Sequence, residues 1–119
     1  MKKILVADDS EFIRKVLKET LSPEFEVVMA NTGKKTLGMY KKEKPDLVLL
    51  DIIMPEGEEE GLQVLKKLME MDKKAVIMMI TAVGQDTIRD ECKRLGARDY
   101  ITKPFNEEEV LTAVRKYLR

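Results

Sequence analysis

Acidic, hydroxyl and ammonium side chains follow four of the five short apolar stretches of this chain. Asp8 and Asp9 come directly after the first stretch, Asp51 ends the third, Thr81 ends the fourth, and Lys103 follows the fifth. If these side chains converge, three carboxylates and one ammonium leave two negative charges uncompensated. Clustered acids repel one another and raise their pKa values unless a cation neutralises them. Ligands that are all oxygen, with few carboxylates, favour a hard divalent ion such as Mg²⁺.

A metal beside a carboxylate and a lysine forms a seat for a phosphoryl group. The metal and the Lys103 ammonium would neutralise charge on its non-bridging oxygens, and the Thr81 hydroxyl could donate a hydrogen bond. A carboxylate can also act as the nucleophile and become an acyl phosphate. Asp51 ends a buried stretch between the other acids and Lys103, so it is the predicted acceptor.

The elements that must position these residues alternate along the chain. Apolar runs that are too uniform for half-exposed strands predict strands covered on both faces, at 4–7, 25–30, 47–50, 75–80 and, more briefly, 100–101. Apolar residues at three- and four-residue spacing predict helices at 11–21, 34–44, 59–71, 85–95 and 107–118. In the first of these helices, Phe12 belongs to the expected apolar face. The predicted fold class is therefore α/β, with a parallel sheet between two layers of helices.

The positions of the polar residues also favour one strand order. Sites in open α/β sheets form beyond the carboxyl ends of the strands, where the strand order reverses. An order of 2-1-3-4-5 would bring Asp8, Asp9 and Asp51 together, with Thr81 and Lys103 on one side of them. The second strand carries no comparable residue and would be an edge. We therefore predict one doubly wound, flavodoxin-like (βα)5 domain spanning residues 1–119.

Composition excludes several other classes of function. The chain has 22 basic and 22 acidic residues, and this balance argues against a nucleic-acid or membrane-surface binder that acts by bulk charge. It has no histidine, which rules out histidine general acid–base catalysis, a serine–histidine triad and histidine metal ligands. The single cysteine, Cys92, cannot form an intrachain disulfide and is expected to be an inert core residue. The longest apolar run, 75–80, is far shorter than the roughly 20 residues of a membrane helix. We expect a cytoplasmic domain.

The ordered set of motifs resembles a receiver domain of the two-component response regulators, close to the stand-alone chemotaxis type. Each motif is weak alone, but together they run from the first strand to the last helix. The matching residues are Ala7-Asp8-Asp9-Ser10 with Arg14, then Leu50-Asp51-Ile52-Ile53-Met54-Pro55, Thr81-Ala82, Gly96-Ala97, and Tyr100 followed by Lys103-Pro104-Phe105.

The resemblance implies a role for each residue of the site. Asp51 would be the phosphoacceptor. Asp8 and Asp9 would hold Mg²⁺ together with Asp51 and the main-chain carbonyl of Ile53. Lys103 would contact the phosphoryl group, and the peptide bond between Lys103 and the following proline would be cis.

The resemblance also implies a switch and its partners. Thr81 and Tyr100 would form the switch pair, whose rearrangement repacks the face made by the fourth helix, fifth strand and fifth helix. A sensor histidine kinase would supply the phosphoryl group, and a downstream protein would bind that face. The domain would catalyse only its own phosphotransfer and dephosphorylation. We expect a monomer that has no direct contact with nucleic acid or membrane.

Two features of the sequence are specific to this chain. Five residues separate Pro55 from Gly61, where the family usually has three, and the added segment is an acidic run expected to be a solvated loop. The positions two residues after Asp51 and Thr81 flank the path of the hydrolysing water in the family. Here they are the apolar Ile53 and Val83, which predicts a long-lived phosphorylated form.

Three other functions are weighed against the switch. A small aspartate-nucleophile phosphohydrolase similar to the haloacid dehalogenase group would need a second Asp two residues after the nucleophile, where Ile53 stands. The complete set of site residues argues against a receiver that acts only as an unphosphorylated interaction module, but the lengthened loop leaves this alternative open. A flavin protein is disfavoured because acids follow the first strand, where a phosphate-binding loop should offer glycine and hydroxyl groups.

Overall fold

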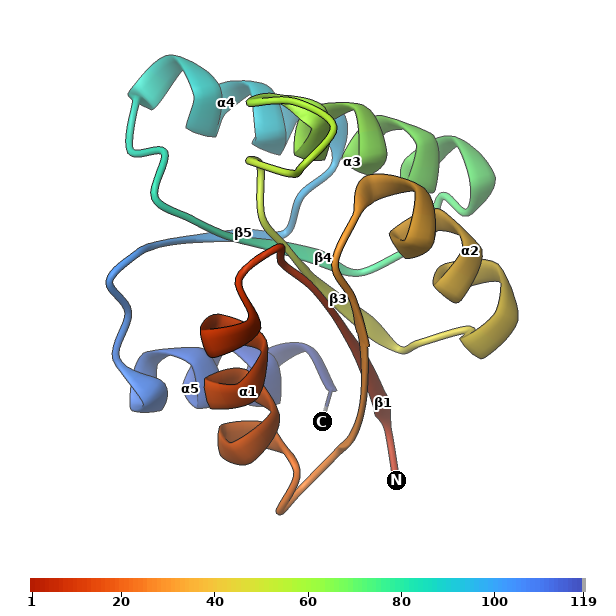
Figure 1. The fold of residues 1–119 in the computed structure, drawn as a ribbon, viewed down its shortest axis with the longest axis vertical. Helices are drawn as coiled ribbons and strands as arrows, with labels where there is room; N and C mark the ends of the chain where they lie inside the picture. Colours follow the sequence, from red (N-terminus) through yellow and green to blue (C-terminus); the bar gives the residue numbers. More distant parts are fainter. Residues whose placement is uncertain (119) are drawn as a thin grey trace.

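The computed structural model describes residues 1–118, which form five strands and five helices in strict alternation (Figure 1). The strands are β1 (Lys3–Ala7), β2 (Glu26–Ala30), β3 (Leu47–Leu50), β4 (Ile77–Thr81) and β5 (Asp99–Thr102). The helices are α1 (Glu11–Leu21), α2 (Gly33–Glu43), α3 (Glu60–Met71), α4 (Asp86–Leu95) and α5 (Glu107–Leu118). All paired strands are parallel, and their order is β2-β1-β3-β4-β5. The predicted α/β class and strand order are confirmed.

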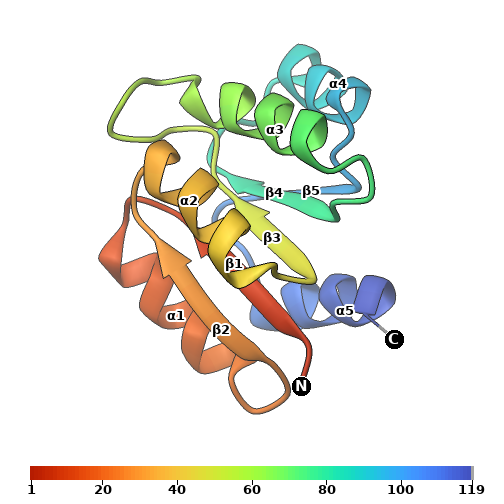
Figure 2. The same cartoon turned by 90° about the vertical axis from the view of Figure 1, so that its right-hand side faces the viewer.

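The sheet is the middle of three layers (Figure 2). Helices α2, α3 and α4 cover one face, where Leu5 and Val48 belong to one apolar cluster. Helices α1 and α5 cover the other face, where the neighbouring residues Ile4 and Leu49 belong to a second cluster. Successive side chains of a strand point to opposite faces, so a strand between two helical layers must be apolar throughout. This is why the central strands are unbroken apolar runs.

The boundaries of β3, α1 and α5 match the predicted ones, and those of the other elements differ by one or two residues. Strand β4 begins and ends later than the predicted run and includes Thr81, and Phe25 precedes β2 instead of opening it. Two helix ends have ordinary caps: the Ser10 side chain accepts from the amide of Ile13, and Gly96 ends α4 with a φ of 117°. Arg119, the last residue of the predicted domain, lies outside the described residues.

The prediction that Phe12 lies on the buried face of the first helix is wrong. Its side chain is 72% exposed, whereas Leu17 and Leu21 are buried. The buried stripe of α1 is centred on residues spaced by four, beginning with Ile13, and Phe12 lies about 100° around the helix from that residue. Spacing of three and four alone did not distinguish the centre of the stripe from its margin.

The lengthened segment between β3 and α3 is an ordered loop. Met54 and Gly57 exchange two backbone hydrogen bonds of 3.1 and 3.0 Å, which close a tight turn around Glu56. The amide of Gly61 donates to the carbonyl of Ile52 over 2.7 Å and closes the base of the loop. The expectation of a loop is confirmed, but the Glu56 side chain is not merely solvated, because it binds two amides of α2.

The start of α3 packs so closely on the end of β3 that only glycine fits. A Cβ at Gly61 would lie 2.2 Å from the carbonyl oxygen of Asp51 and 2.4 Å from the Cα of Ile52. These are backbone atoms of Asp51 and its neighbour, so they cannot move aside without displacing the predicted acceptor. Among residues 1–118, no helix has both the length and the apolar character needed to cross a membrane.

A pair of glycine-to-alanine substitutions tests this contact. We expect Gly61→Ala to lower the free energy of unfolding by about 3 kcal/mol, since the methyl group would overlap backbone atoms. Gly38→Ala is the control, because nothing lies within 4 Å of its added Cβ and the site is inside α2. It should raise the free energy of unfolding by about 0.5–1 kcal/mol. Urea denaturation measures both, and an unchanged stability for Gly61→Ala would refute the close packing.

Candidate functional site

The predicted site residues lie at the carboxyl edge of the sheet. The register pairs Ala7 of β1 with Leu50 of β3, so Asp8 and Asp51 leave the sheet side by side. The amide of Asp51 donates to the carbonyl of Ala7 over 3.0 Å, which fixes the two strand ends against each other. At the far side, the amide of Lys103 donates to the carbonyl of Thr81 over 2.8 Å. The parallel register thus brings together residues that are up to 95 positions apart.

One ammonium group joins the two buried acids. The Nζ of Lys103 lies 2.7 Å from Oδ2 of Asp8 and 2.8 Å from Oδ2 of Asp51. Asp8 is 2% exposed and Asp51 is 5% exposed, so water screens these charges little. The pair of short bonds therefore fixes the position of the lysine between the strand ends.

The burial of this cluster affects the protonation of its members. Burial raises the pKa of Asp8, and the lowering effects of Lys103 and of the Ser10 amide do not offset it fully. Burial also lowers the pKa of the Lys103 ammonium, but the hydrogen bonds from Asp51 and Asp8 outweigh burial and raise it overall. The lysine therefore stays charged at neutral pH, whereas burying the ionised form of Asp8 costs folding free energy.

Backbone amides hold the second oxygen of each buried acid. Oδ1 of Asp8 accepts from the amide of Ser10 over 2.9 Å, and Oδ1 of Asp51 accepts from the amide of Ile53 over 3.3 Å. The guanidinium of Arg14 donates to the main-chain carbonyl of Asp8 over 2.8 Å. Arg14 thereby ties the first turn of α1 to the end of β1, which orients the loop that carries the acids.

The donor set suits a hard divalent cation. One carboxylate oxygen from each of Asp8, Asp9 and Asp51 lies within 4.8 Å of the others. Asp9 is exposed and the other two are buried, so the group opens to solvent on one side only. Oxygen ligands of this kind, with room for water, are typical of Mg²⁺ sites. The part played by the carbonyl of Ile53 stays a prediction.

Thr81 and Tyr100 meet at a single residue, Val83. The buried Thr81 hydroxyl accepts from the amide of Val83 over 3.3 Å, and the Tyr100 hydroxyl donates to the carbonyl of the same residue. Burial raises the pKa of Tyr100 to about 12, so its hydroxyl remains a donor at neutral pH. A movement of the loop after β4 would therefore change the hydrogen bonds of both side chains.

Comparison with known proteins identifies the family. The sequence profile of the response regulator receiver domain matches residues 4–115 of this chain. The chain belongs to that family. The receiver domain is 40% identical to the chemotaxis protein CheY of Halobacterium salinarum, and the match covers 98% of this chain and 97% of the relative. It is 38% identical to sporulation initiation phosphotransferase F of Bacillus subtilis, covering 98% and 93%.

A solved complex shares the fold of this receiver domain. The CheX-CheY-BeF3-Mg²⁺ complex of Borrelia burgdorferi contains a chain that superposes with a TM-score of 0.90 at 34% identity, covering 97% of this chain and 87% of that one. The family binds Mg²⁺ in an acidic pocket, and the group of Asp8, Asp9 and Asp51 lies at the corresponding edge of the sheet. Receiver domains are signalling modules and not enzymes in the usual sense.

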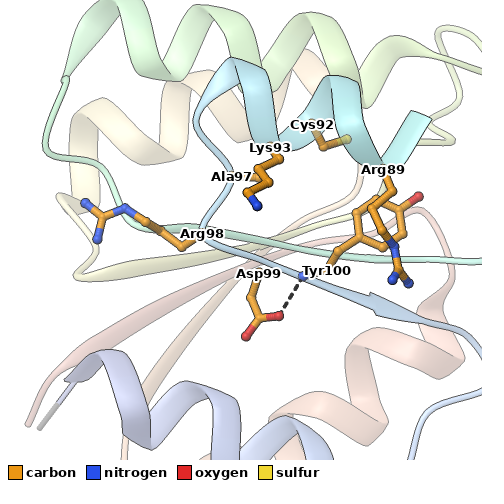
Figure 3. A pocket seen from close by; sticks show the side chains of 7 residues that line it. All are labelled: Arg89, Cys92, Lys93, Ala97, Arg98, Asp99 and Tyr100. Atoms are coloured by element: carbon orange, nitrogen blue, oxygen red, sulfur yellow. Dashed lines mark hydrogen bonds between the residues drawn. The ribbon is translucent and has the colours of Figure 1, made fainter. Parts of the chain in front are cut away.

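Tyr100 also borders a small pocket between α4 and β5 of the receiver domain (Figure 3). The pocket holds about 260 Å³, and Arg89, Lys93 and Arg98 are among the residues that line it. The Arg89 guanidinium lies 5.0 Å from the centre of the Tyr100 ring, a cation–π contact. Sequence analysis missed this basic lining, although the four-residue spacing of Arg89 and Lys93 signals a shared helical face.

Cys92 borders the same pocket and is buried. Burial raises the pKa of its thiol to about 11, so the thiolate is scarce at neutral pH. This agrees with the expected inert role. The bond between Lys103 and Pro104 is cis, as the resemblance implied.

Substitution of Asp8 tests the cost of burying its charge. Because its pKa is raised in the folded state, stability contributed by Asp8 falls as pH rises from the unfolded pKa to the folded one. We expect Asp8→Asn, without divalent cations, to be more stable than the wild type by on the order of 1 kcal/mol at pH 7. This advantage should shrink on acidification towards pH 4. Urea denaturation at both pH values measures it, and a variant less stable than the wild type at pH 7 would contradict the argument.

Proposed function

We propose that this receiver domain, residues 1–119, is a phosphorylation-dependent switch that accepts a phosphoryl group on Asp51. The observation that carries the proposal is the pairing of a buried, metal-accessible carboxylate with the Lys103 ammonium at 2.8 Å. A nucleophile that is held by a cation beside two further acids suits phosphoryl transfer, where charge builds up on the transferred oxygens.

Each residue then has a defined part in the transfer. An Asp51 oxygen attacks phosphorus and forms an acyl phosphate, while the bond from phosphorus to the donor breaks and its electron pair leaves with the donor. Asp8, Asp9, Asp51 and the main-chain carbonyl of Ile53 would hold Mg²⁺, which would supply positive charge at the transferred oxygens. Lys103 gives up its bond to Asp51 and contacts the phosphoryl group.

The switch follows from the contacts of Val83. In this structure the Thr81 hydroxyl accepts a hydrogen bond from the amide of Val83. When that hydroxyl turns to donate to the phosphoryl group, its bond to the Val83 amide breaks. The loop after β4 can then move, and the carbonyl of Val83 that binds the Tyr100 hydroxyl moves with it. Tyr100 would repack, and the face of α4, β5 and α5 would shift between two arrangements.

The partners follow from the same face and site. A sensor histidine kinase would donate the phosphoryl group, and a downstream protein would bind the α4–β5–α5 face, where Arg89 and Lys93 favour an acidic segment. In Borrelia burgdorferi, CheY forms a complex with the protein CheX. We propose a cytoplasmic monomer without direct contact to nucleic acid or membrane. The equal numbers of acidic and basic residues agree with this.

Intact-mass measurement after incubation with acetyl phosphate tests the function. We expect a gain of one phosphoryl group that requires Mg²⁺ and is lost in Asp51→Asn. Asp90→Asn is the matched control, because that aspartate is exposed on α4 and should leave the gain unchanged. Sustained release of phosphate from unrelated esters would support a phosphohydrolase instead. No mass gain in the wild type would leave an unphosphorylated interaction module.

The lifetime of the acyl phosphate is a separate prediction. Ile53 and Val83 line one pocket of about 330 Å³ beside the acceptor, and Ile53 is 39% exposed. These apolar side chains would hinder the attacking water, so Ile53→Asn should accelerate loss of the phosphoryl group several-fold. Met71→Asn is the control, since Met71 is similarly exposed at the end of α3. Decay that is already fast in the wild type and unaffected by Ile53→Asn would contradict the prediction.

A further inference from the structure

The lengthened loop after β3 is fastened to a helix that is distant in the sequence. The Glu56 carboxylate accepts from the amide of Gly33 through Oε1 and from the amide of Lys34 through Oε2, both over 2.9 Å. These amides belong to the first turn of α2, where backbone donors have no partner inside the helix. Glu56 therefore satisfies two free donors of another element with a single side chain.

Electrostatics strengthens this fastening. The amino end of a helix carries a partial positive charge that favours a carboxylate. The hydrogen bonds from Gly33 and Lys34 lower the pKa of Glu56, so the carboxylate is charged at neutral pH. Thr32 caps the same helix by accepting from Lys35, so Glu56 fills the positions that the ordinary cap leaves open.

The same loop carries Ile53, whose carbonyl is the expected main-chain metal ligand. Ile53 lies between two buried anchors, Ile52 and Met54, which are 1% and 3% exposed. Met54 is bonded to Gly57 in both directions, and Glu56 lies inside that turn. Glu56 and Ile53 are therefore connected through the hydrogen-bonded turn of Met54 and Gly57.

The amino end of α2 also packs closely against α3, the helix that follows this loop. A Cβ at Gly33 would lie 3.0 Å from Cγ of Glu60 and 3.0 Å from Cγ2 of Val64, both at the start of α3. The amino ends of α2 and α3 therefore touch, with Glu56 between the loop and α2 (the loop after β3 is seen beside α2 in Figure 2).

We propose that Glu56 is a positioning residue: by fastening the loop after β3 to the amino end of α2, it holds the Ile53 carbonyl in place at the metal site. This inference rests on the proposed function, because it assumes that Mg²⁺ binds there. Metal binding and the first turn of α2 are then coupled through one carboxylate.

Three variants separate the fastening from its charge. Glu56→Gln removes the charge and puts an amide donor where two backbone donors converge. Glu56→Asp keeps the charge but is one methylene too short to reach both amides. Glu58→Gln is the matched control: it removes the same charge from the same loop, and Glu58 is exposed without a bonded partner among residues 1–118.

The first measurement is amide hydrogen exchange of the full chain by NMR, without metal. We expect exchange at Gly33 and Lys34 to accelerate about tenfold in both Glu56 variants and to stay unchanged in Glu58→Gln. Urea denaturation confirms that each variant is folded under the conditions used. Unchanged exchange at both amides in Glu56→Gln would overturn the fastening itself.

The second measurement is a Mg²⁺ titration of the same proteins. We expect both Glu56 variants to bind Mg²⁺ about three- to tenfold more weakly than the wild type, and Glu58→Gln to stay within about twofold. Equal weakening by Glu58→Gln and Glu56→Gln, with none in Glu56→Asp, would show a long-range charge effect and overturn the proposal. So would faster exchange with unchanged Mg²⁺ affinity. If the wild type does not bind Mg²⁺ at all, the proposed function fails first, which is a different result.

Discussion

The ammonium of Lys103 between Asp8 and Asp51 is the interaction on which the arrangement of the site depends. Both carboxylates end strands buried between two helical layers, so they have lost most of their water. A buried charge left without any partner costs on the order of several kcal/mol. The compensating cation comes from the loop after β5, so the ends of β1, β3 and β5 must lie on the same edge of the sheet. Strand order, register and charge balance are therefore parts of one constraint.

The same constraint leaves the Lys103 ammonium shared between two carboxylates. Lys103 bonds to both acids, and in the proposed function it gives up its bond to Asp51 and contacts a phosphoryl group. The raised pKa of Asp8 shows that one ammonium does not fully compensate two buried acids.

Much of this architecture could be predicted from the sequence, because the information is local. Unbroken apolar runs identified the buried strands, and the polar residue that ends each run marked the edge of the sheet where the site lies. Asp8, Asp51 and Lys103 were predicted to converge for that reason, and their distances confirm it. Other features depend on distances across the fold. Glu56 was interpreted as part of a solvated run, since nothing in its own segment shows that the amides of Gly33 and Lys34 lie opposite it. The exposure of Phe12 depends likewise on the orientation of α1 against the sheet.

The central claim is that Asp8, Asp9 and Asp51 surround one hard cation next to Lys103. The most direct measurement is an anomalous difference map from crystals grown with Mn²⁺, a hard ion whose scattering identifies its position. The account predicts one strong peak at the carboxyl edge of the sheet, at coordination distance from oxygens of the group Asp8, Asp9 and Asp51 and next to Lys103. A map without a peak there, with Mn²⁺ bound instead along the acidic loop after β3, would contradict it.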